Sequence, residues 1–306
     1  MRSSDDVIAC VGNLFRIPVV LVESQMSGEM DYDDFRKKLK ENAGKPAIVS
    51  INIGTTVKGA VDSLAEVKAA LSENDFTEEN TFIHCDGALA GLLLPFAGET
   101  EVANSASRLF QVSFEKGVDT ISVSGHKMLG CPMPCGVVIT KKEHMKRFAK
   151  TVEYLNSTDT TIMGSRNGQA SIAMWVALQQ KHGIEGLKAD VSVCFKNARF
   201  LLSILREAGV SSLLNKYSTT VVFERPPPAC VKRWQLACTG NIAHVVVMPS
   251  TDQPKLKAFV EDYLQCMTEH ALAGGGRPNI AGEIGAENCP PFASKQDRSV
   301  SPALVN

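Results

Sequence analysis

The stretch "AIVSINIGTTVKGAVDSLAEVKAALSENDFTEENTFIHCDG", residues 47–87, determines the fold class of this chain. Residues 47–53 are apolar and β-branched, which predicts a strand, and residues 63–73 have the periodicity of a helix. A second short apolar run, residues 81–85, stops at Asp86. A strand, a helix and another strand in this order predict two parallel strands joined by a crossover helix.

The same alternation continues on both sides of this stretch. Residues 17–22 and 120–124 read as further strands, residues 135–140 as another, and residues 32–42 as a helix. Strands that alternate with helices predict a mostly parallel, doubly wound α/β sheet. We expect this large domain to occupy residues 1–182.

The remainder of the chain has a different character. Residues 185–209 form a long amphipathic pattern, residues 218–225 read as a strand, and residues 254–270 as a closing helix. This predicts a smaller α+β domain over residues 183–270. The tail, residues 271–306, has little periodicity and many glycines and prolines, so we expect it to be disordered.

Charge, hydropathy and cysteine content limit the partners and the location that we expect for this chain. The chain has 306 residues, of which 44% are hydrophobic, and a formal net charge of −1. It has no basic surplus, which argues against nucleic acid or an anionic membrane as the main partner. No apolar run approaches the roughly 18–20 residues that span a bilayer, which predicts a soluble protein. Nine scattered cysteines favour reduced thiols and a cytoplasmic location.

Polar side chains follow three of the predicted strands at the point where each ends. In doubly wound sheets, ligands bind beyond the carboxyl ends of the strands. We therefore expect the three clusters to meet in one crevice. The clusters are Gly54-Thr55-Thr56, Asp86-Gly87-Ala88 and Gly125-His126-Lys127.

Lys127 is the first candidate for chemistry. Most lysines are ordinary surface residues, but this one follows a buried strand and precedes apolar residues and glycine. Such surroundings favour the neutral amine, the form that attacks a carbonyl. His126 is either a polar strand end or a donor to a phosphate, and Ser124 is near enough to donate to an anion.

Asp86 is the second candidate. An aspartate after a strand is commonly a helix cap, but a buried carboxylate can also pair with a cation. A protonated pyridine nitrogen is one such cation, and aspartate is its usual partner in pyridoxal phosphate enzymes. Ala88 would leave room for a flat ring. Thr56 is either a turn residue or a hydroxyl that reaches a ring substituent.

Other chemistries have less support. Cys131 and Cys135 have a spacing that is weak for zinc, and prolines lie between them, so we expect no metal site. The chain contains no G-x-S-x-G elbow and no G-x-G-x-x-G fingerprint. The sequence therefore contains no motif that would indicate a serine hydrolase or a dinucleotide-binding enzyme.

Four strings identify a family. "INIGTTVKGAVD", "HCDGALAG", "SVSGHKMLGCPMPCG" and "TIMGSRNG", in that order, resemble the group II pyridoxal-phosphate-dependent amino-acid decarboxylases. Within that family the likeness is to plant and algal serine decarboxylases, often labelled histidine-decarboxylase-like. The resemblance runs from about Ile17 to His270, and it rests on several long strings in the same order.

The resemblance implies a type I pyridoxal phosphate fold and a homodimer with active sites at the subunit interface. It also assigns roles by position. Lys127 would form the Schiff base with the cofactor, His126 would contact the phosphate, Asp86 would pair with the pyridinium nitrogen, Ala88 would lie against the ring, Thr56 would approach the ring oxygen, and Tyr154 would be a mobile-loop tyrosine that protonates the product carbon.

The implied activity is decarboxylation of an L-amino acid, with serine giving ethanolamine and carbon dioxide; histidine is the alternative substrate. The family match begins almost at Met1, so we expect the phosphate-binding turn to be missing from this chain. The position of the ring-stacking histidine falls at about Asp5. A second hypothesis is therefore a catalytically impaired chain that acts by dimerising with a full-length relative.

Overall fold

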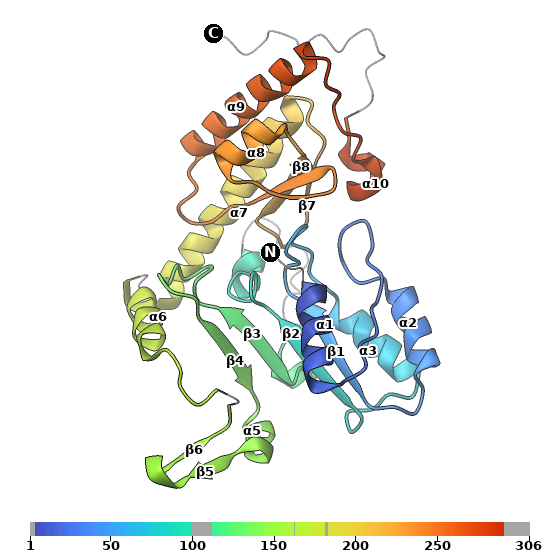
Figure 1. Cartoon of the computed structure of the whole chain (residues 1–306), viewed down its shortest axis with the longest axis vertical. Coiled ribbons are helices and arrows are strands. Elements are labelled where there is room, and N and C mark those ends of the chain that lie inside the picture. The colour runs from blue at the N-terminus through green and yellow to red at the C-terminus, as the bar shows by residue number, and fades with distance from the viewer. Residues whose placement is uncertain (1–3, 100–111, 162, 181–182, 291–306) are drawn as a thin grey trace. The chain divides into compact units, whose positions relative to one another are not determined.

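The computed structural model describes residues 4–99, 112–161, 163–180 and 183–290 (Figure 1). The chain forms two compact units. The first unit comprises residues 1–193 with 216–218, and the second comprises residues 194–215 with 219–306. The division falls inside helix α7, Gly183–Glu207, whereas the expected domain boundary lies at the start of the same helix.

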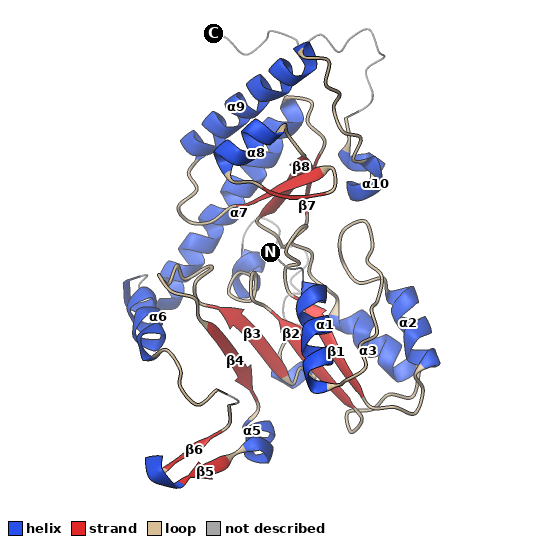
Figure 2. Cartoon of the chain, viewed as in Figure 1, coloured by secondary structure: helices blue, strands red, loops and turns tan. Residues whose placement is uncertain are grey.

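The first unit contains a four-stranded sheet in the order β1-β2-β3-β4 (Figure 2). The three strands β1, β2 and β3 are parallel, and β4 pairs with β3 in the antiparallel direction. The predicted α/β sheet is therefore confirmed. Its strands are β1 Ala47–Asn52, β2 Thr81–Asp86, β3 Thr120–Ser124 and β4 Gly136–Thr140.

Helix α3, Leu64–Glu73, is the crossover between β1 and β2. The Ser63 side chain caps it by accepting from the Glu66 amide at 3.4 Å, which satisfies one of the unpaired amides of the first turn. Its buried residues are Leu64, Val67, Ala70 and Leu71, which recur at helical spacing.

Helix α2, Tyr32–Glu41, agrees with the predicted helix. The Asp31 side chain accepts from the amides of Asp33 and Asp34 at its start, and Phe35 and Leu39 form its buried face. Their i, i+4 spacing brings them onto one side of the helix.

The predicted strand at residues 17–22 is wrong. The chain there is irregular, and Leu21 is exposed, because no described strand offers this segment a ladder to join. A helix, α1 Ser4–Phe15, precedes it, which the sequence interpretation did not anticipate.

The first unit continues beyond β4 through several short elements. A two-stranded hairpin, β5–β6, follows helix α5, and helix α6 leads to α7. The elements are α5 Lys142–Phe148, β5 Lys150–Val152, β6 Ser157–Asp159 and α6 Gly168–Gln180, with 3-10 turns η1 Leu94–Glu99, η3 Phe114–Lys116 and η4 Glu153–Leu155.

The second unit has an antiparallel sheet in the order β7-β8-β10-β9, with α7, α8 and α9. Its buried residues form one hydrophobic cluster in which Phe223, Phe259 and Tyr263 touch one another, their ring centroids 5.5–6.1 Å apart. The elements are β7 Ser212–Leu214, β8 Thr220–Glu224, α8 Pro228–Trp234, β9 Ala237–Thr239, β10 Ile242–Val246 and α9 Gln253–Leu272.

Order continues past the point where the sequence pattern predicted a disordered tail. Helix α10, Ala281–Ile284, and turn η5, Ala286–Asn288, follow α9, and Ile280 is buried. The Arg277 guanidinium bonds to the buried Glu224 carboxylate at 2.8 Å. This segment is ordered by a few separate contacts, and such contacts produce no hydrophobic periodicity from which the sequence could predict the order. Residues 291–306 lie outside the described residues.

None of the described helices combines the length and the apolar character that crossing a membrane requires.

Candidate active site

The carboxyl ends of β1, β2 and β3 meet at one edge of the sheet, as the sequence predicts. Asn52 of β1 is in register with Asp86 of β2, and Asp86 is in register with Ser122 of β3. The segments that follow these strands carry Thr56, Ala88 and Lys127. Parallel pairing alone therefore brings three polar clusters to the same edge.

Asp86 lies in the middle of this edge and is half-buried. Its Oδ1 accepts from the Ala88 amide at 3.0 Å and is 3.5 Å from the Ser122 hydroxyl. Its Oδ2 accepts no hydrogen bond from the described residues. One carboxylate oxygen therefore holds the side chain in place, and the other is open to a cationic partner.

A polar ladder supports Asp86 from the amino-terminal side. It consists of His84 and Asp86 on β2 with Thr120 and Ser122 on β3. The His84 Nδ1 is 2.7 Å from the Thr120 hydroxyl, and its Nε2 is 3.4 Å from the Ser122 hydroxyl. Burial lowers the pKa of His84, and the Asp86 charge opposes that shift. A neutral imidazole is thus favoured, with one nitrogen that donates and one that accepts.

The sequence interpretation did not place His84 in the site. The signal for its actual place was its two-residue spacing from Asp86, which puts both side chains on one face of a strand. Its partners on β3 also recur every second residue. Register between the two strands was the information that the sequence lacked.

Lys127 lies in a loop whose backbone is closed by several hydrogen bonds. Its amide donates to the Ser124 carbonyl at 3.3 Å, and its carbonyl accepts from the Gly130 amide at 3.0 Å. Gly125 donates to the Cys135 carbonyl at 3.0 Å and accepts from the Cys131 amide at 3.1 Å. The loop therefore holds the half-buried Lys127 in a defined turn just past β3.

Gly125 is required at the base of this loop because Cys135 packs against it. A Cβ at Gly125 would lie 2.7 Å from the Cys135 sulfur and 3.1 Å from Cγ of Met174. Any larger residue would displace the loop or helix α6. The neighbouring residues Met128 and Leu129 are buried, so the loop is anchored on both sides of Lys127.

His126 is exposed, and its ring is bound to the same loop. The His126 Nδ1 lies 3.1 Å from both the amide nitrogen and the carbonyl oxygen of Cys135. Its Nε2 makes no hydrogen bond to the described residues, so Nε2 is the ring atom that can meet an anion. Ser124, also half-buried, uses its carbonyl to hold Lys127.

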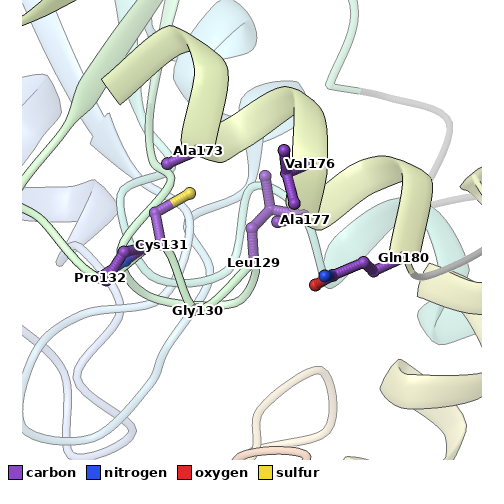
Figure 3. Close-up of a pocket in the computed structure, with 8 residues that line it drawn as sticks. All are labelled: Leu129, Gly130, Cys131, Pro132, Ala173, Val176, Ala177 and Gln180. Carbon is purple, nitrogen blue, oxygen red and sulfur yellow. The ribbon is translucent and has the colours of Figure 1, made fainter. Parts of the chain in front are cut away.

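A pocket of about 650 Å³ flanks the Lys127 loop on the side of α6 (Figure 3). None of the predicted site residues lines it. The residues that line it are Leu129, Gly130, Cys131, Pro132, Ala173, Val176, Ala177 and Gln180.

Thr56 and Ala88 follow the other two strands. The Thr55 hydroxyl accepts from the Ala60 amide at 3.0 Å, so Thr55 stabilises its own turn. The half-buried Thr56 hydroxyl has no hydrogen-bond partner among the described residues. The Gly87 amide donates to the Ser122 carbonyl at 2.9 Å, and this fixes the half-buried Ala88 beside Asp86.

Tyr154 does not join this cluster within the chain. It lies in η4, between the strands of the β5–β6 hairpin, and is 88% exposed. Strand β4 runs antiparallel to β3, so that Thr140 pairs with Thr120, the first residue of β3. The chain therefore leaves β4 at the edge opposite to Lys127, and the hairpin lies beyond α5 (Figure 1).

Asp5 falls within α1, and its side chain is not among those that the structure describes.

Comparison with known proteins agrees with this geometry. The family described as "Pyridoxal-dependent decarboxylase conserved domain" matches residues 2–225. The chain belongs to the pyridoxal-dependent decarboxylase family. Its identity to serine decarboxylase 1 of Oryza sativa subsp. japonica is 47% over 290 residues, which covers 94% of this chain and 58% of the relative.

Two further proteins illustrate the range of likeness. Histidine decarboxylase of Solanum lycopersicum is 43% identical over 253 residues, covering 82% of this chain and 59% of that protein. A crystal structure of L-methionine decarboxylase from Streptomyces sp. 590 has a TM-score of 0.67 at 25% identity, covering 80% of this chain and 60% of that one. The predicted type I pyridoxal phosphate fold is confirmed.

The chain spans a little under three-fifths of the length of the serine decarboxylases it matches. The residues at the sheet edge nevertheless fit the cofactor of the decarboxylase family, pyridoxal phosphate. An amine, a carboxylate with one open oxygen and a hydroxyl without a described partner follow three adjacent parallel strands. Pyridoxal phosphate enzymes use a lysine amine at the cofactor aldehyde and a charged partner such as aspartate at its ring nitrogen.

Proposed function

We propose that this chain forms the cofactor site of a pyridoxal-phosphate-dependent decarboxylase that converts serine into ethanolamine and carbon dioxide. The observation that carries the proposal is Asp86, fixed through one oxygen and open at the other, beside the loop that holds Lys127. The identity to serine decarboxylases supports serine as the substrate.

The proposal gives each residue at the sheet edge a task. Lys127 Nζ would hold the cofactor at its aldehyde, and Asp86 Oδ2 would accept from its ring nitrogen. Nε2 of His126 and the Ser124 hydroxyl donate to the phosphate. Ala88 leaves space for the ring, and the Thr56 hydroxyl donates to the ring oxygen.

When bound, pyridoxal phosphate supplies the electron sink that lets the bond to the substrate carboxylate break. Asp86 favours the protonated ring nitrogen because its negative charge stabilises a nearby cation. The His84–Ser122 ladder holds the Asp86 carboxylate in one orientation, which saves reorganisation during the reaction. Lys127 would supply the amine that holds the cofactor at its aldehyde.

We also propose that the chain works in the cytoplasm as a dimer, either with a second copy or with a full-length relative. Apolar side chains on α1 and after it, including Leu14, Phe15 and Leu21, are exposed. Exposed patches of this kind often mark protein interfaces. Tyr154 would then act in the site of the partner subunit.

The cysteines are free thiols, which fits a reducing compartment.

Two alternatives rest on particular observations. The 43% identity to a histidine decarboxylase keeps histidine as a second candidate substrate. The partial coverage of the relatives keeps an impaired chain that acts through dimerisation as a second candidate function.

The deciding experiment is a titration of the purified chain with pyridoxal phosphate, followed by its visible absorbance. Wild type and Lys142→Ala, which changes an exposed lysine of α5, should both develop the band of cofactor bound to a lysine. Lys127→Ala should not. A wild-type protein without the band would overturn the proposed cofactor site.

Product analysis with a panel of amino acids then tests the substrate. Ethanolamine from serine is the expected product. Histamine from histidine, with no ethanolamine, would replace serine by histidine. A cofactor band without any amine product would favour the impaired chain, and sedimentation velocity would show whether that chain dimerises.

A further inference from the structure

The loop that carries Lys127 also brings two cysteines together. Cys131 donates its amide to the Gly125 carbonyl, and Cys135 accepts from the Gly125 amide, at 3.1 and 3.0 Å. Both cysteine backbones are therefore bound to the same residue, although four positions separate them along the chain. The Cys135 sulfur lies directly over Gly125.

The two thiols of this loop interact. The Cys135 thiol lies close enough to the Cys131 thiol to raise its pKa. Cys131 is 5% exposed and lines the pocket beside α6 (Figure 3). Cys135 is half-buried. A small disulfide can therefore reach the pair through Cys135.

We propose that Cys131 and Cys135 are a modification site, a dithiol that a low-molecular-weight disulfide such as oxidised glutathione converts into a disulfide within the Lys127 loop. Formation of this disulfide is independent of the proposed function. Its consequence for pyridoxal phosphate rests on that function.

The reaction balances in two exchanges. The Cys135 thiolate attacks one sulfur of oxidised glutathione, and a sulfur–sulfur bond to Cys135 forms as one glutathione thiolate leaves. The Cys131 sulfur then attacks Cys135, the mixed disulfide breaks, and the second glutathione leaves as a thiol after taking the Cys131 proton. The protein loses two hydrogen atoms, and one oxidised glutathione becomes two reduced molecules.

Burial determines which thiol attacks first. Burial raises the pKa of the Cys131 thiol, and the neighbouring Cys135 raises it further. Because the thiolate is the nucleophile, the second exchange should accelerate as the pH rises. Cys135, with the greater exposure, is the residue that meets the oxidant.

The disulfide would change the residues around Lys127. A sulfur–sulfur bond of about 2.05 Å is shorter than any contact between two thiols, so the base of the loop must contract. Cys135 carries the hydrogen bonds to His126 and to Gly125. We expect the oxidised protein to need more pyridoxal phosphate for half-saturation than the reduced one.

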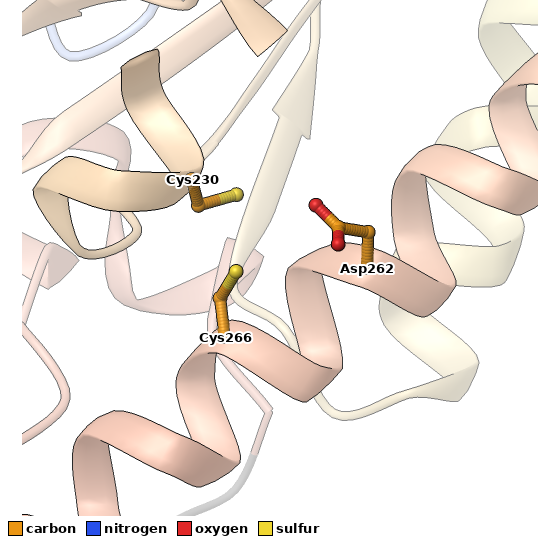
Figure 4. Close-up of side chains that lie close together, drawn as sticks. All are labelled: Cys230, Asp262 and Cys266. Atoms are coloured by element: carbon orange, nitrogen blue, oxygen red, sulfur yellow. The ribbon is translucent and has the colours of Figure 1, made fainter. Parts of the chain in front are cut away.

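The second unit contains a matched pair that should resist the same oxidant. The Sγ atoms of Cys230 and Cys266 and a carboxylate oxygen of Asp262 all lie within 4.8 Å of one another (Figure 4). Cys230 is fully buried, and burial raises the pKa of its thiol to about 12. The Asp262 carboxylate accepts hydrogen bonds from Arg233 and from Trp234, so both of its oxygens already have a donor.

The experiment is oxidation of the full chain with oxidised glutathione, alkylation of the remaining thiols, trypsin digestion and mass spectrometry. The tryptic peptide of residues 128–141 contains both loop cysteines. The expected result is a loss of two hydrogen atoms in this peptide, while Cys230 and Cys266 are alkylated. Alkylation of both loop cysteines, or a glutathione adduct that stays on Cys135, would overturn the site.

Two variants test the order of the exchanges. Cys131→Ser should keep a stable glutathione adduct on Cys135, because no second thiol displaces it. Cys135→Ser should stay unmodified at Cys131. A glutathione adduct on Cys131 in that variant would contradict the proposed order, and the wild-type masses decide the site even if a variant fails to fold.

Titration with pyridoxal phosphate before and after oxidation tests the consequence. A higher half-saturation concentration after oxidation, reversed by a thiol reductant, is expected. Identical titrations would overturn the coupling to the cofactor. If the reduced protein binds no cofactor, the proposed function fails, and the mass analysis still reports on the disulfide.

Discussion

The two units each contain a four-stranded sheet, but the two sheets use their residues differently. Every residue of β8 in the second unit is buried, and the core of that unit consists of aliphatic side chains around the contacting rings of Phe223, Phe259 and Tyr263. In the first unit, hydrogen-bonded polar side chains run along β2 and β3 to the half-buried Asp86 at the carboxyl edge of the sheet. The difference indicates that the second sheet contributes mainly stability and that the first positions side chains for a ligand.

The largest expected effect is on stability, from Phe223→Ala in the second unit. Phe223 is fully buried, and its ring centroid lies 5.5 Å from that of Phe259. Truncation leaves a cavity and should lower the free energy of unfolding by about 3–5 kcal/mol. Urea denaturation measures it, with Ile48→Ala, at a strand residue that is 67% exposed, as the control. If both variants lost the same free energy of unfolding, the second sheet would not be the main source of stability.

Asp86→Asn should act on the ligand rather than on the fold. The amide keeps an oxygen for the Ala88 amide but loses the charge that pairs with a ring nitrogen. Loss of a charge-assisted hydrogen bond costs about 1.5–3 kcal/mol, so pyridoxal phosphate should bind roughly 10 to 100 times more weakly. The melting temperature should change little.

The control for Asp86 is Asp33→Asn, whose side chain is 98% exposed on α2. It should leave the titration with pyridoxal phosphate unchanged. An Asp86→Asn protein that binds the cofactor as tightly as wild type would show that this carboxylate is a structural cap only.

Thr120→Val should have a smaller effect of the same kind. It removes the hydroxyl that contacts His84 at 2.7 Å, one step away from Asp86. A single hydrogen bond contributes about 0.5–1.5 kcal/mol, so cofactor affinity should fall by less than in Asp86→Asn. Thr151→Val, on the exposed strand β5, is the matched control. A loss as large as that of Asp86→Asn would mean that the ladder, and not the carboxylate alone, determines binding.

The sequence predicted those parts of the molecule that follow from local pattern. The crossover helix α3 and the three polar strand ends were visible because periodicity and turn residues are local signals. Residues 17–22 have the composition of a strand, but a strand also needs a neighbouring strand to pair with. The His84–Thr120 contact and the position of Tyr154 depend on strand register and direction, which a single sequence does not contain.

The smallest expected effect is a difference in acid sensitivity between the two sheets. Burial lowers the pKa of His244 on β10 and of His84 on β2. The unfolded chain then binds protons at a higher pH than the folded chain, so stability rises with pH between the two values. Each histidine therefore contributes stability that is present above the unfolded pKa of about 6.5 and is lost as the pH falls below it.

The two histidines should differ because the Asp86 charge opposes the shift of His84, while only burial acts on His244. Melting temperatures measured between pH 8 and pH 5 should therefore fall less steeply in His244→Gln than in wild type. His84→Gln should flatten the same profile to a lesser degree. A steeper profile in His244→Gln would contradict the sign, and equal flattening in both variants would show that Asp86 does not affect His84. The acid profile thus tests whether the first sheet, unlike the second, stabilises charge at its carboxyl edge.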